Sequence, residues 1–441
     1  MNTLTSKATF QRVLNKLGTF EANLSATERI ALHRILPARF SELDFLFASP
    51  DEILSRSEQE IFSRLQIEEF DLTQPCRFRS PTVLIMKATR LCNLRCTYCH
   101  AWKEGPNQVM PFEVLMKTTR DVLLRPEVKR VNFVWHGGEV TVLPIEFFQK
   151  ALWLQRVFRR EDQIVSNSIQ TNATRLNDEW TALFAAGNFQ IGVSIDGPPK
   201  IHDLRRVTKT GQPTWEKVRA GIARLREANL PWGVLVVVDR HIIELGPKRL
   251  LECLLELRVG GAALLNVIPQ NSGHQPNEKD YLPWPAYVDF LAGIFRCWWP
   301  QYRDKIDIRE LSALVHNLSG HAPNVCVLAG NCMGQFLTVE PNGTISACDK
   351  YIGDEQFEFG NVLHSDLNAV LADSGNLARA QKQAQLEVTE MSDCKYFAYC
   401  RGGCPHDRRL NRLYQTAWDG HCCGLWNLLD EIATALHNES A

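Results

Sequence analysis

The chain has 441 residues, of which 45% are hydrophobic and 22% charged, with a formal net charge of −1. This length suggests two or three domains, and the near-neutral charge argues against a nucleic-acid partner. The first residues, MNTLTSKATF, lack the apolar core of a signal peptide, and no apolar run is long enough to cross a bilayer. We therefore expect a cytoplasmic protein without a membrane partner.

Residues 1–80 carry apolar side chains at helical spacing, as in FQRVLNKLGTF and ERIALHRIL. The later segment SPDEILSRSEQEIFSRL adds a serine, a proline and acidic residues that are typical of helix starts. The pattern predicts a helical amino-terminal extension over residues 1–80. Such an extension could recognise a peptide or serve only as structural support.

From residue 81, short apolar strands alternate with amphipathic helices, which predicts an α/β fold with a parallel sheet and helical crossovers. A barrel or partial barrel is favoured, with its chemistry at the carboxyl ends of the strands. After about residue 305, glycine, cysteine and turn residues predict a metal-stapled domain, closed by a helix near 424–437. The expected strands are 82–88, 130–136, 166–172, 189–196, 232–239 and 262–268, and the expected helices are 112–124, 145–158, 177–187 and 215–228.

The chain contains 14 cysteines, and clustered thiols in a reducing compartment more often bind metal than form disulfides. Cys92, Cys96 and Cys99 follow the first predicted strand directly. A structural zinc site normally supplies four ligands, whereas three thiolates suit a [4Fe–4S] cluster with one open iron. Spacing alone leaves zinc with a distant fourth ligand as an alternative.

Four segments in order identify a family resemblance. CNLRCTYC has the spacing C-x3-C-x2-C, and HGGE (136–139), SIQTNAT (168–174) and VSIDGPPKIHDLRR (193–206) follow it. Together they resemble the radical S-adenosylmethionine (AdoMet, SAM) enzymes, especially the sulfatase-maturating branch. The resemblance implies a partial (β/α)6 TIM-like radical SAM barrel over residues 81–305. It also implies AdoMet bound to the open iron of a cluster held by Cys92, Cys96 and Cys99.

The resemblance implies contacts with AdoMet. Gly137 and Gly138 would let the backbone approach its methionine moiety, and Glu139 would pair with its ammonium group. Val140 stands where the family usually has proline. Without the cysteine loop, each of these residues has an ordinary structural explanation, such as a strand-ending turn. The remaining cofactor contacts are implied for Tyr98, near the adenine, and for Ser194 and Arg206, near the ribose and carboxylate.

The later cysteines resemble the SPASM extension, a Cys-rich domain with auxiliary iron–sulfur clusters, here over residues 306–441. The resemblance implies a first auxiliary [4Fe–4S] cluster held by Cys326, Cys332, Cys348 and Cys404. A second auxiliary cluster would use Cys394, Cys400 and one member of the pair Cys422 and Cys423.

The second auxiliary site departs from the family pattern, because Met391 stands where the family has a cysteine. A thioether is a weak, neutral ligand that cannot replace a thiolate on iron. The site could keep an open iron, use Asp393, use both cysteines of the pair, or be absent. A single ligand from the pair is favoured, because adjacent cysteines rarely reach one cluster without strain. A zinc ion in place of the cluster is a further alternative at this site.

Family members reduce AdoMet to a 5′-deoxyadenosyl radical, and those with SPASM domains commonly modify peptides. Asp349 follows Cys348, as does the proposed base of the sulfatase-maturating enzymes; a salt bridge beside Lys350 is the ordinary alternative. We expect an oxidoreductase that cross-links side chains in a ribosomally made precursor peptide. Alternatives are formylglycine formation on a sulfatase, backbone excision, and an iron–sulfur electron-transfer module without catalysis. Expected partners are the peptide or protein substrate and an electron donor such as flavodoxin or ferredoxin.

Overall fold

Strand β1 (Thr82–Thr89) lies inside a ten-stranded sheet in the computed structural model, which describes residues 44–440 except 69, 71, 270–280, 416, 417 and 419. The strand order among these residues is β10-β9-β8-β1-β2-β3-β4-β5-β6-β7. All neighbours from β8 to β7 are parallel, and β9 and β10 add antiparallel pairs. The other strands are β2 (Arg130–Gly137), β3 (Ile164–Thr171), β4 (Gln190–Ser194), β5 (Trp232–Val238), β6 (Gly261–Asn266), β7 (Asp307–Ile308), β8 (Phe336–Val339), β9 (Thr344–Ser346) and β10 (Glu358–Asn361).

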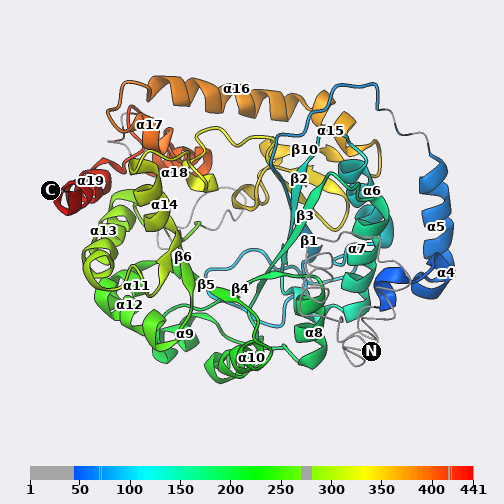
Figure 1. The fold of residues 1–441 in the computed structure, drawn as a ribbon, viewed down its shortest axis with the longest axis horizontal. Helices are drawn as coiled ribbons and strands as arrows, with labels where there is room; N and C mark the ends of the chain where they lie inside the picture. The colour runs from blue at the N-terminus through cyan, green and yellow to red at the C-terminus, as the bar shows by residue number, and fades with distance from the viewer. Residues whose placement is uncertain are drawn as a thin grey trace, which may run out of the picture.

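Helices follow the strands along the outside of an open arc (Figure 1). The six predicted strands and four predicted helices are confirmed, with ends that differ by about two residues at most. The α/β fold with a parallel sheet is therefore confirmed. The helices of this arc are α6 (Phe112–Leu123), α7 (Ile145–Phe158), α8 (Asp178–Ala186), α9 (Pro199–Arg205), α10 (Trp215–Glu227), α11 (Arg240–Leu245), α12 (Pro247–Glu256), α13 (Trp284–Gln301) and α14 (Arg309–Leu318).

The sheet does not end near residue 305, where the sequence pattern changes. On one side β7 pairs with β6, and on the other side β8 pairs with β1. The cysteine-rich part of the chain therefore adds strands directly to the barrel sheet. Its helices are α15 (Leu367–Asp373), α16 (Gly375–Glu390), α17 (Phe397–Cys400), α18 (Pro405–Tyr414) and α19 (Trp426–Ser440), and α19 confirms the closing helix. Short 3-10 turns include η2 (Val140–Val142) and η5 (Asp349–Tyr351).

The amino-terminal helices pack against the barrel. A turn η1 (Asp44–Phe47) precedes α4 (Pro50–Ile53) and α5 (Arg56–Ile67), and Ser49 and Ser55 form capping boxes at the two helix starts. The Phe62 ring lies 5.1 Å from the Trp153 ring of α7, between centroids. The helices expected from FQRVLNKLGTF and ERIALHRIL lie outside the described residues.

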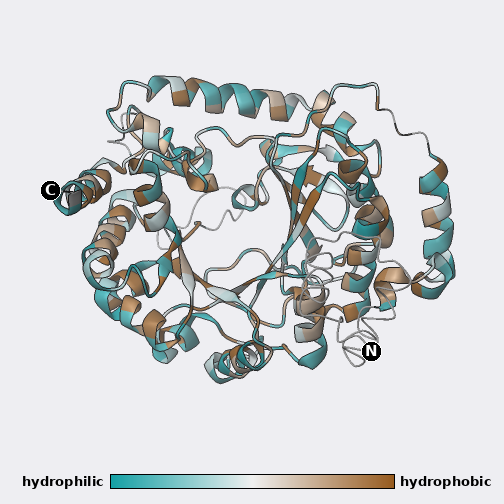
Figure 2. Cartoon of the chain, viewed as in Figure 1, coloured by the Kyte–Doolittle hydropathy of each residue, from teal (hydrophilic) through white to brown (hydrophobic). Residues whose placement is uncertain are grey.

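The core lies between the strands and the inner faces of the helices. Figure 2 shows polar and apolar residues side by side on outer helices such as α5 and α16, as expected for helices with one buried face. Trp135 of β2 is fully buried, packs edge-to-face on Phe148 and donates from Nε1 to Asn167 Oδ1 at 2.8 Å. No helix among the described residues is long and apolar enough to cross a membrane.

Replacing Trp135 tests this packing. Trp135→Ala should lower the free energy of unfolding of the apoprotein by about 3–5 kcal/mol, because it leaves a large cavity and removes one of the two hydrogen bonds that Asn167 Oδ1 accepts. Trp426→Ala is the matched control, since Trp426 is 49% exposed at the start of α19 and should change stability by about 0.5 kcal/mol or less. Anaerobic urea denaturation measures both. Equal losses would contradict the assigned core.

Candidate functional site

The loop after β1 carries the three clustered cysteines into a cavity of about 1040 Å³. Backbone hydrogen bonds attach this loop to the end of α9 and the segment after it: Thr97 N donates to Arg205 O and Arg95 N to Val207 O, both at 2.8 Å. Two parts of the chain that are distant in sequence therefore form one wall. The cavity is lined by Cys92, Cys96, Cys99, Tyr98, Gly137, Gly138, Glu139, Ser194, Arg206 and Asp349, which are all of the barrel-site residues predicted from the sequence together with the predicted base.

The surroundings of the three thiols suit an iron–sulfur cluster. The backbone N–H groups of Leu94 and Ala101 donate to Cys92 Sγ and Cys99 Sγ at 3.3 and 3.4 Å, and N–H···S bonds of this kind tune cluster thiolates. In the free protein, burial raises the pKa of Cys92 to about 12 and that of Cys96 to about 11. A bound metal reverses this effect, because its positive charge stabilises thiolates.

Within the described parts of the chain, no group of three or more histidine, cysteine or acidic side chains could hold a metal ion. A [4Fe–4S] cluster is larger than a single ion and holds its thiolates farther apart. The shared cavity and the N–H···S bonds are therefore the features that bear on a cluster.

Two glycines at the end of β2 touch the start of the cysteine loop. Gly138 N donates to Thr89 O and Glu139 N to Leu91 O, both at 2.8 Å. A Cβ atom at Gly137 would lie 2.0 Å from Thr89 O, and one at Gly138 would lie 2.1 Å from Leu91 O. Glycine is therefore required for contact with this protein's own backbone, which is a different reason from the cofactor approach expected from the sequence.

Glu139 is buried and held by four donors. Its Oε1 accepts from Thr141 N, from Thr141 Oγ1 at 2.6 Å and from Thr171 Oγ1 at 2.7 Å, and its Oε2 accepts from Asn172 N at 2.7 Å. The carboxylate thus joins the ends of β2 and β3 in one rigid position at the cavity wall. Oε2 accepts only one of these hydrogen bonds, so it is the oxygen better able to accept another donor. The pairing of Glu139 with an ammonium group stays a prediction.

Tyr98 joins a buried network with Asp196, an aspartate that was not predicted from the sequence. Its hydroxyl donates to Asp196 Oδ2 at 2.7 Å and accepts from Arg206, whose Nη1 also lies 3.6 Å from the same Asp196 oxygen. The guanidinium of Arg205 stacks on the Tyr98 ring at 4.7 Å. Ser194 accepts from Gln170 Nε2 at 2.8 Å. This network fixes the tyrosine, and its predicted place near an adenine stays a prediction.

Asp349 lines the same cavity and meets Lys87 and His136 there. Its carboxylate forms an ion pair with Lys87 of β1 and lies 3.6 Å from His136 Nδ1. Lys87 Nζ lies 2.9 Å from His136 Nδ1. Because an ammonium group only donates, Nδ1 accepts this bond, and the neutral ring carries its proton on Nε2.

The charges of this trio are set by their environment. Burial would raise the pKa of Asp349, but the ammonium of Lys87 and the His136 ring outweigh burial and hold it well below its usual range. Burial and the Lys87 charge lower the pKa of His136 to about 4. At neutral pH the trio therefore consists of a carboxylate, an ammonium and a neutral imidazole.

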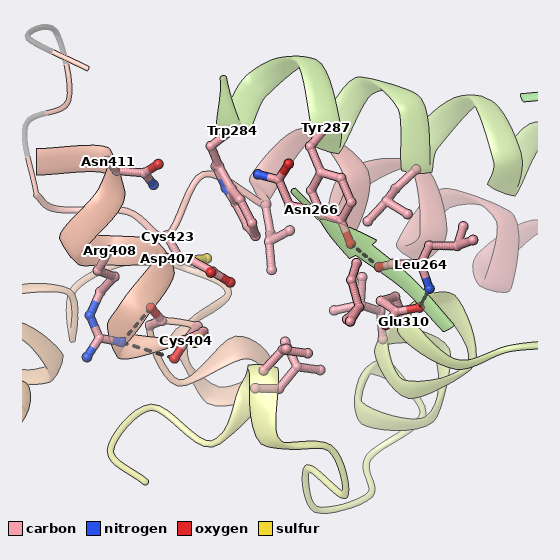
Figure 3. A pocket seen from close by; sticks show the side chains of 18 of the residues that line it. Leu264, Asn266, Trp284, Tyr287, Glu310, Cys404, Asp407, Arg408, Asn411 and Cys423 are labelled. Carbon is pink, nitrogen blue, oxygen red and sulfur yellow. Dashed lines mark hydrogen bonds between the residues drawn. The ribbon is translucent and has the colours of Figure 1, made fainter. Parts of the chain in front are cut away.

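The neighbouring Lys350 takes no part in this trio, although the sequence suggested it as the salt-bridge partner. Lys350 Nζ pairs with Asp407 Oδ1 at 2.8 Å and lies 3.8 Å from Cys404 Sγ. It lines a second cavity of about 630 Å³ that also borders Cys404 and Cys423 (Figure 3). Asp349 and Lys350 thus contribute to different cavities.

The first set of carboxy-terminal cysteines lies close to the start of η5. Burial and the nearby thiols raise the pKa of Cys348 well above its usual range, and burial and the Asp407 carboxylate, with a smaller contribution from Cys332, raise that of Cys404 to about 12. Cys332 interacts electrostatically with both, and Cys326 with Cys332. Cys332, Cys348 and Cys404 therefore interact with one another, and the exposed Cys326 is linked to them through Cys332, while their role as ligands stays a prediction.

Four residues of these networks were not predicted from the sequence: Lys87, His136, Asp196 and Asp407. Lys87 gave a signal, because it is a charged residue inside a predicted buried strand, and such a residue needs a partner. His136 stood within the quoted HGGE segment, and Asp196 within the quoted VSIDGPPKIHDLRR segment, but neither received a role. Asp407 follows CPH in an unremarkable helix start and gave no signal.

Gly138 can be tested by substitution. Gly138→Ala should displace the Leu91 backbone and with it Cys92, so that the reconstituted protein loses about four irons per chain, the content of one cluster. Gly260→Ala is the control, because a Cβ there meets nothing within 4 Å. Iron and sulfide analysis measures both variants. Full iron content in Gly138→Ala would contradict the proposed role of this contact.

Comparison with known proteins agrees with this geometry. Residues 86–244 match the Radical SAM superfamily. The chain is 30% identical over 397 residues to a serine-type anaerobic sulfatase-maturating enzyme of Bacteroides thetaiotaomicron, a match that covers 81% of this chain and 90% of the relative. It is 27% identical over 337 residues to a cysteine-type enzyme of Clostridium perfringens, covering 73% and 88%.

Solved structures show the same fold. Native anSMEcpe with bound AdoMet superposes with a TM-score of 0.68 at 25% identity, covering 80% of this chain and 97% of that one. Streptococcus suis SuiB bound to S-adenosylmethionine superposes with a TM-score of 0.52 at 14% identity, covering 91% and 85%, which is a likeness of fold. With a relative matched over nine-tenths of its length, the chain belongs to the radical SAM enzymes, which use AdoMet and a [4Fe–4S] cluster, and is related to the anaerobic sulfatase-maturating enzymes.

Proposed function

We propose that this enzyme oxidises a side chain of a peptide or protein, with Asp349 as the proton acceptor. The observation that carries the proposal is the carboxylate of Asp349, which is paired with Lys87 and lies beside His136 at the wall of the cavity that also contains the cysteine loop. When bound, the cluster and AdoMet supply a 5′-deoxyadenosyl radical that takes a hydrogen atom from the substrate. The residues of the chain then have to bind, orient and deprotonate that substrate.

The barrel residues would hold AdoMet between two fixed walls. Cys92, Cys96 and Cys99 would ligate the cluster, and Glu139 would receive the ammonium group at the end of β2. The Tyr98 and Ser194 side chains would face the nucleoside, with Arg206 nearby. Glu139, Tyr98, Ser194 and Arg206 already have partners in the protein, so these side chains would not need to reorganise when the cofactor enters.

Asp349 is suited to a strongly acidic partner. A carboxylate whose pKa is held low stays ionised, and it takes a proton readily only from a group that has become a strong acid. A substrate that has lost a hydrogen atom and then an electron is such a group. Lys87 would orient the carboxylate from strand β1. The neutral His136 would accept the Lys87 hydrogen bond without adding charge.

The electron from the substrate needs an acceptor close to this proton acceptor. Cys348 directly precedes Asp349, so a first auxiliary cluster on Cys326, Cys332, Cys348 and Cys404 would lie one residue from the base. Lys350 Nζ donates to Cys404 Sγ at 3.8 Å while Asp407 balances its charge, and this hydrogen bond to a ligand sulfur would favour reduction of that cluster. Proton and electron would thus leave the substrate towards two adjacent parts of the chain.

Two products share this chemistry. Side-chain cross-linking in a ribosomally made precursor peptide remains the first candidate, with residues 1–80 as a possible peptide-binding extension to the barrel (81–305) and the cysteine-rich domain (306–441). Formylglycine formation is the second candidate, and it is favoured by the match over 90% of a sulfatase-maturating relative. An external donor such as flavodoxin or ferredoxin would reduce the AdoMet-site cluster in either case.

Tandem mass spectrometry separates the two products. A small peptide encoded beside the gene, and a peptide with a sulfatase motif, would each be incubated anaerobically with reconstituted enzyme, AdoMet and reductant. Loss of two hydrogens with fragmentation blocked between two residues indicates a cross-link, whereas a new aldehyde indicates formylglycine. The proposed function would be contradicted if the enzyme formed 5′-deoxyadenosine but left the side chains of both peptides unoxidised.

Replacing Asp349 tests the proposed base. Asp349→Asn should lower product formation about 100-fold or more, because the amide cannot take the proton, while 5′-deoxyadenosine formation stays within about twofold. Asp373→Asn, which changes an exposed aspartate at the end of α15, is the control. Liquid chromatography with mass spectrometry quantifies both products. Unchanged product formation in Asp349→Asn would remove Asp349 from the mechanism.

A further inference from the structure

The second set of carboxy-terminal cysteines forms one connected group of four sulfurs. Cys394 and Cys400 lie before and at the end of α17, and Cys422 and Cys423 precede α19. Cys423 Sγ donates to Cys400 Sγ at 3.5 Å. Cys422 lies close enough to Cys394 and to its neighbour Cys423 to interact with both thiols. Both members of the adjacent pair therefore meet the other two thiols, which the sequence did not lead us to expect.

A backbone N–H two positions later lies near each of these four thiols. Gly424 N donates to Cys422 Sγ at 3.3 Å, and the N–H groups of Tyr396, Gly402 and Leu425 lie near the sulfurs of Cys394, Cys400 and Cys423. The same bond is made at Cys92 and Cys99 of the AdoMet site. It also occurs at the solitary Cys76, so the gathering of four thiols, rather than the bond alone, indicates a cluster.

Glycines allow the two halves of this group to approach. A Cβ atom at Gly403 would lie 3.2 Å from Cys423 Cβ, a distance that forces one of them to shift. Gly403 has a φ of 74°, in the left-handed region, and the buried Arg408 binds the carbonyls of Gly402 and Gly403 at 2.9 and 3.0 Å (Figure 3). Gly424, with a φ of 81°, turns the chain directly after the pair.

The alternatives for the missing ligand are less well placed. Met391 is 1% exposed, and its Sδ would lie 3.0 Å from a Cβ at Gly402, so the thioether fills core space beside the glycine loop. Asp393 is exposed to solvent. A neutral thioether cannot replace a thiolate, and an exposed carboxylate would have to leave water to reach the thiols.

We propose that Cys394, Cys400, Cys422 and Cys423 together hold the second auxiliary [4Fe–4S] cluster, and that the second thiolate of the adjacent pair replaces the ligand lost at Met391. The complete set of four leaves no iron open for substrate, so this cluster would transfer electrons only. Cys423 and Cys404 line the same cavity, opposite Tyr287 and Glu310 (Figure 3). The cluster would therefore neighbour the first auxiliary cluster and extend the electron route of the proposed function.

Iron content tests this ligand set without any catalytic assay. The full chain with Cys92→Ala, Cys96→Ala and Cys99→Ala removes the AdoMet-site cluster and should retain about eight irons after anaerobic reconstitution, four in each auxiliary cluster. Adding either Cys422→Ala or Cys423→Ala should remove about four irons or leave a three-iron cluster with a changed electron paramagnetic resonance spectrum. Adding Cys76→Ala, at a cysteine outside the four proposed ligands, should change neither the iron content nor the spectrum.

Three results would overturn the proposal: full iron content with an unchanged spectrum in either single variant, zinc in place of iron, or about four irons in the parent chain. If an alanine variant loses all its iron, Cys422→Ser and Cys423→Ser test whether each cysteine is a ligand. A serine oxygen can keep iron bound but shifts the electron paramagnetic resonance spectrum. An unchanged spectrum in either serine variant overturns the proposal. Because no AdoMet cleavage is measured, failure here is distinct from failure of the proposed function.

Discussion

The close contact between the end of β2 and the start of the cysteine loop is the constraint on which the site depends. Two backbone hydrogen bonds of 2.8 Å, from Gly138 N to Thr89 O and from Glu139 N to Leu91 O, join strand ends that have no room for a Cβ atom between them. The contact fixes the three thiols relative to Glu139. Because Glu139 is in turn bonded to Thr171 and Asn172, the end of β3 belongs to the same rigid unit.

Strand β1 also connects this unit to the cysteine-rich part of the chain. It pairs with β2 on one side and β8 on the other, and its Lys87 side chain pairs with Asp349, just beyond β9. Asp349 and Lys350 then contribute to different cavities, one shared with the AdoMet-site cysteines and one bordered by Cys404 and Cys423. A chemical account of the enzyme follows from this arrangement, because hydrogen abstraction, proton acceptance and electron acceptance fall to adjacent segments.

The sequence predicted the elements that carry local periodic patterns and the motifs with fixed spacing. The six barrel strands and the cavity-lining motif residues are of this kind. It could not predict that β8, a run of only four residues, adds to β1, since short apolar runs carry no information about their partners. Nor could it pair Lys87 with Asp349, since that contact depends on the β1–β8 pairing. The ligand roles, the three domain boundaries and the helices expected before residue 44 stay predictions.

The most direct test of the account is 5′-deoxyadenosine formation from AdoMet by the anaerobically reconstituted enzyme with a strong reductant, compared with Cys96→Ala. The account predicts steady formation by the unmodified enzyme and none by Cys96→Ala, because the cluster would lose one of its three thiolates. Cys253→Ala, a buried thiol of α12 away from the cysteine groups, should behave as the unmodified enzyme. Equal formation by Cys96→Ala and the unmodified enzyme would contradict the assignment of the radical site.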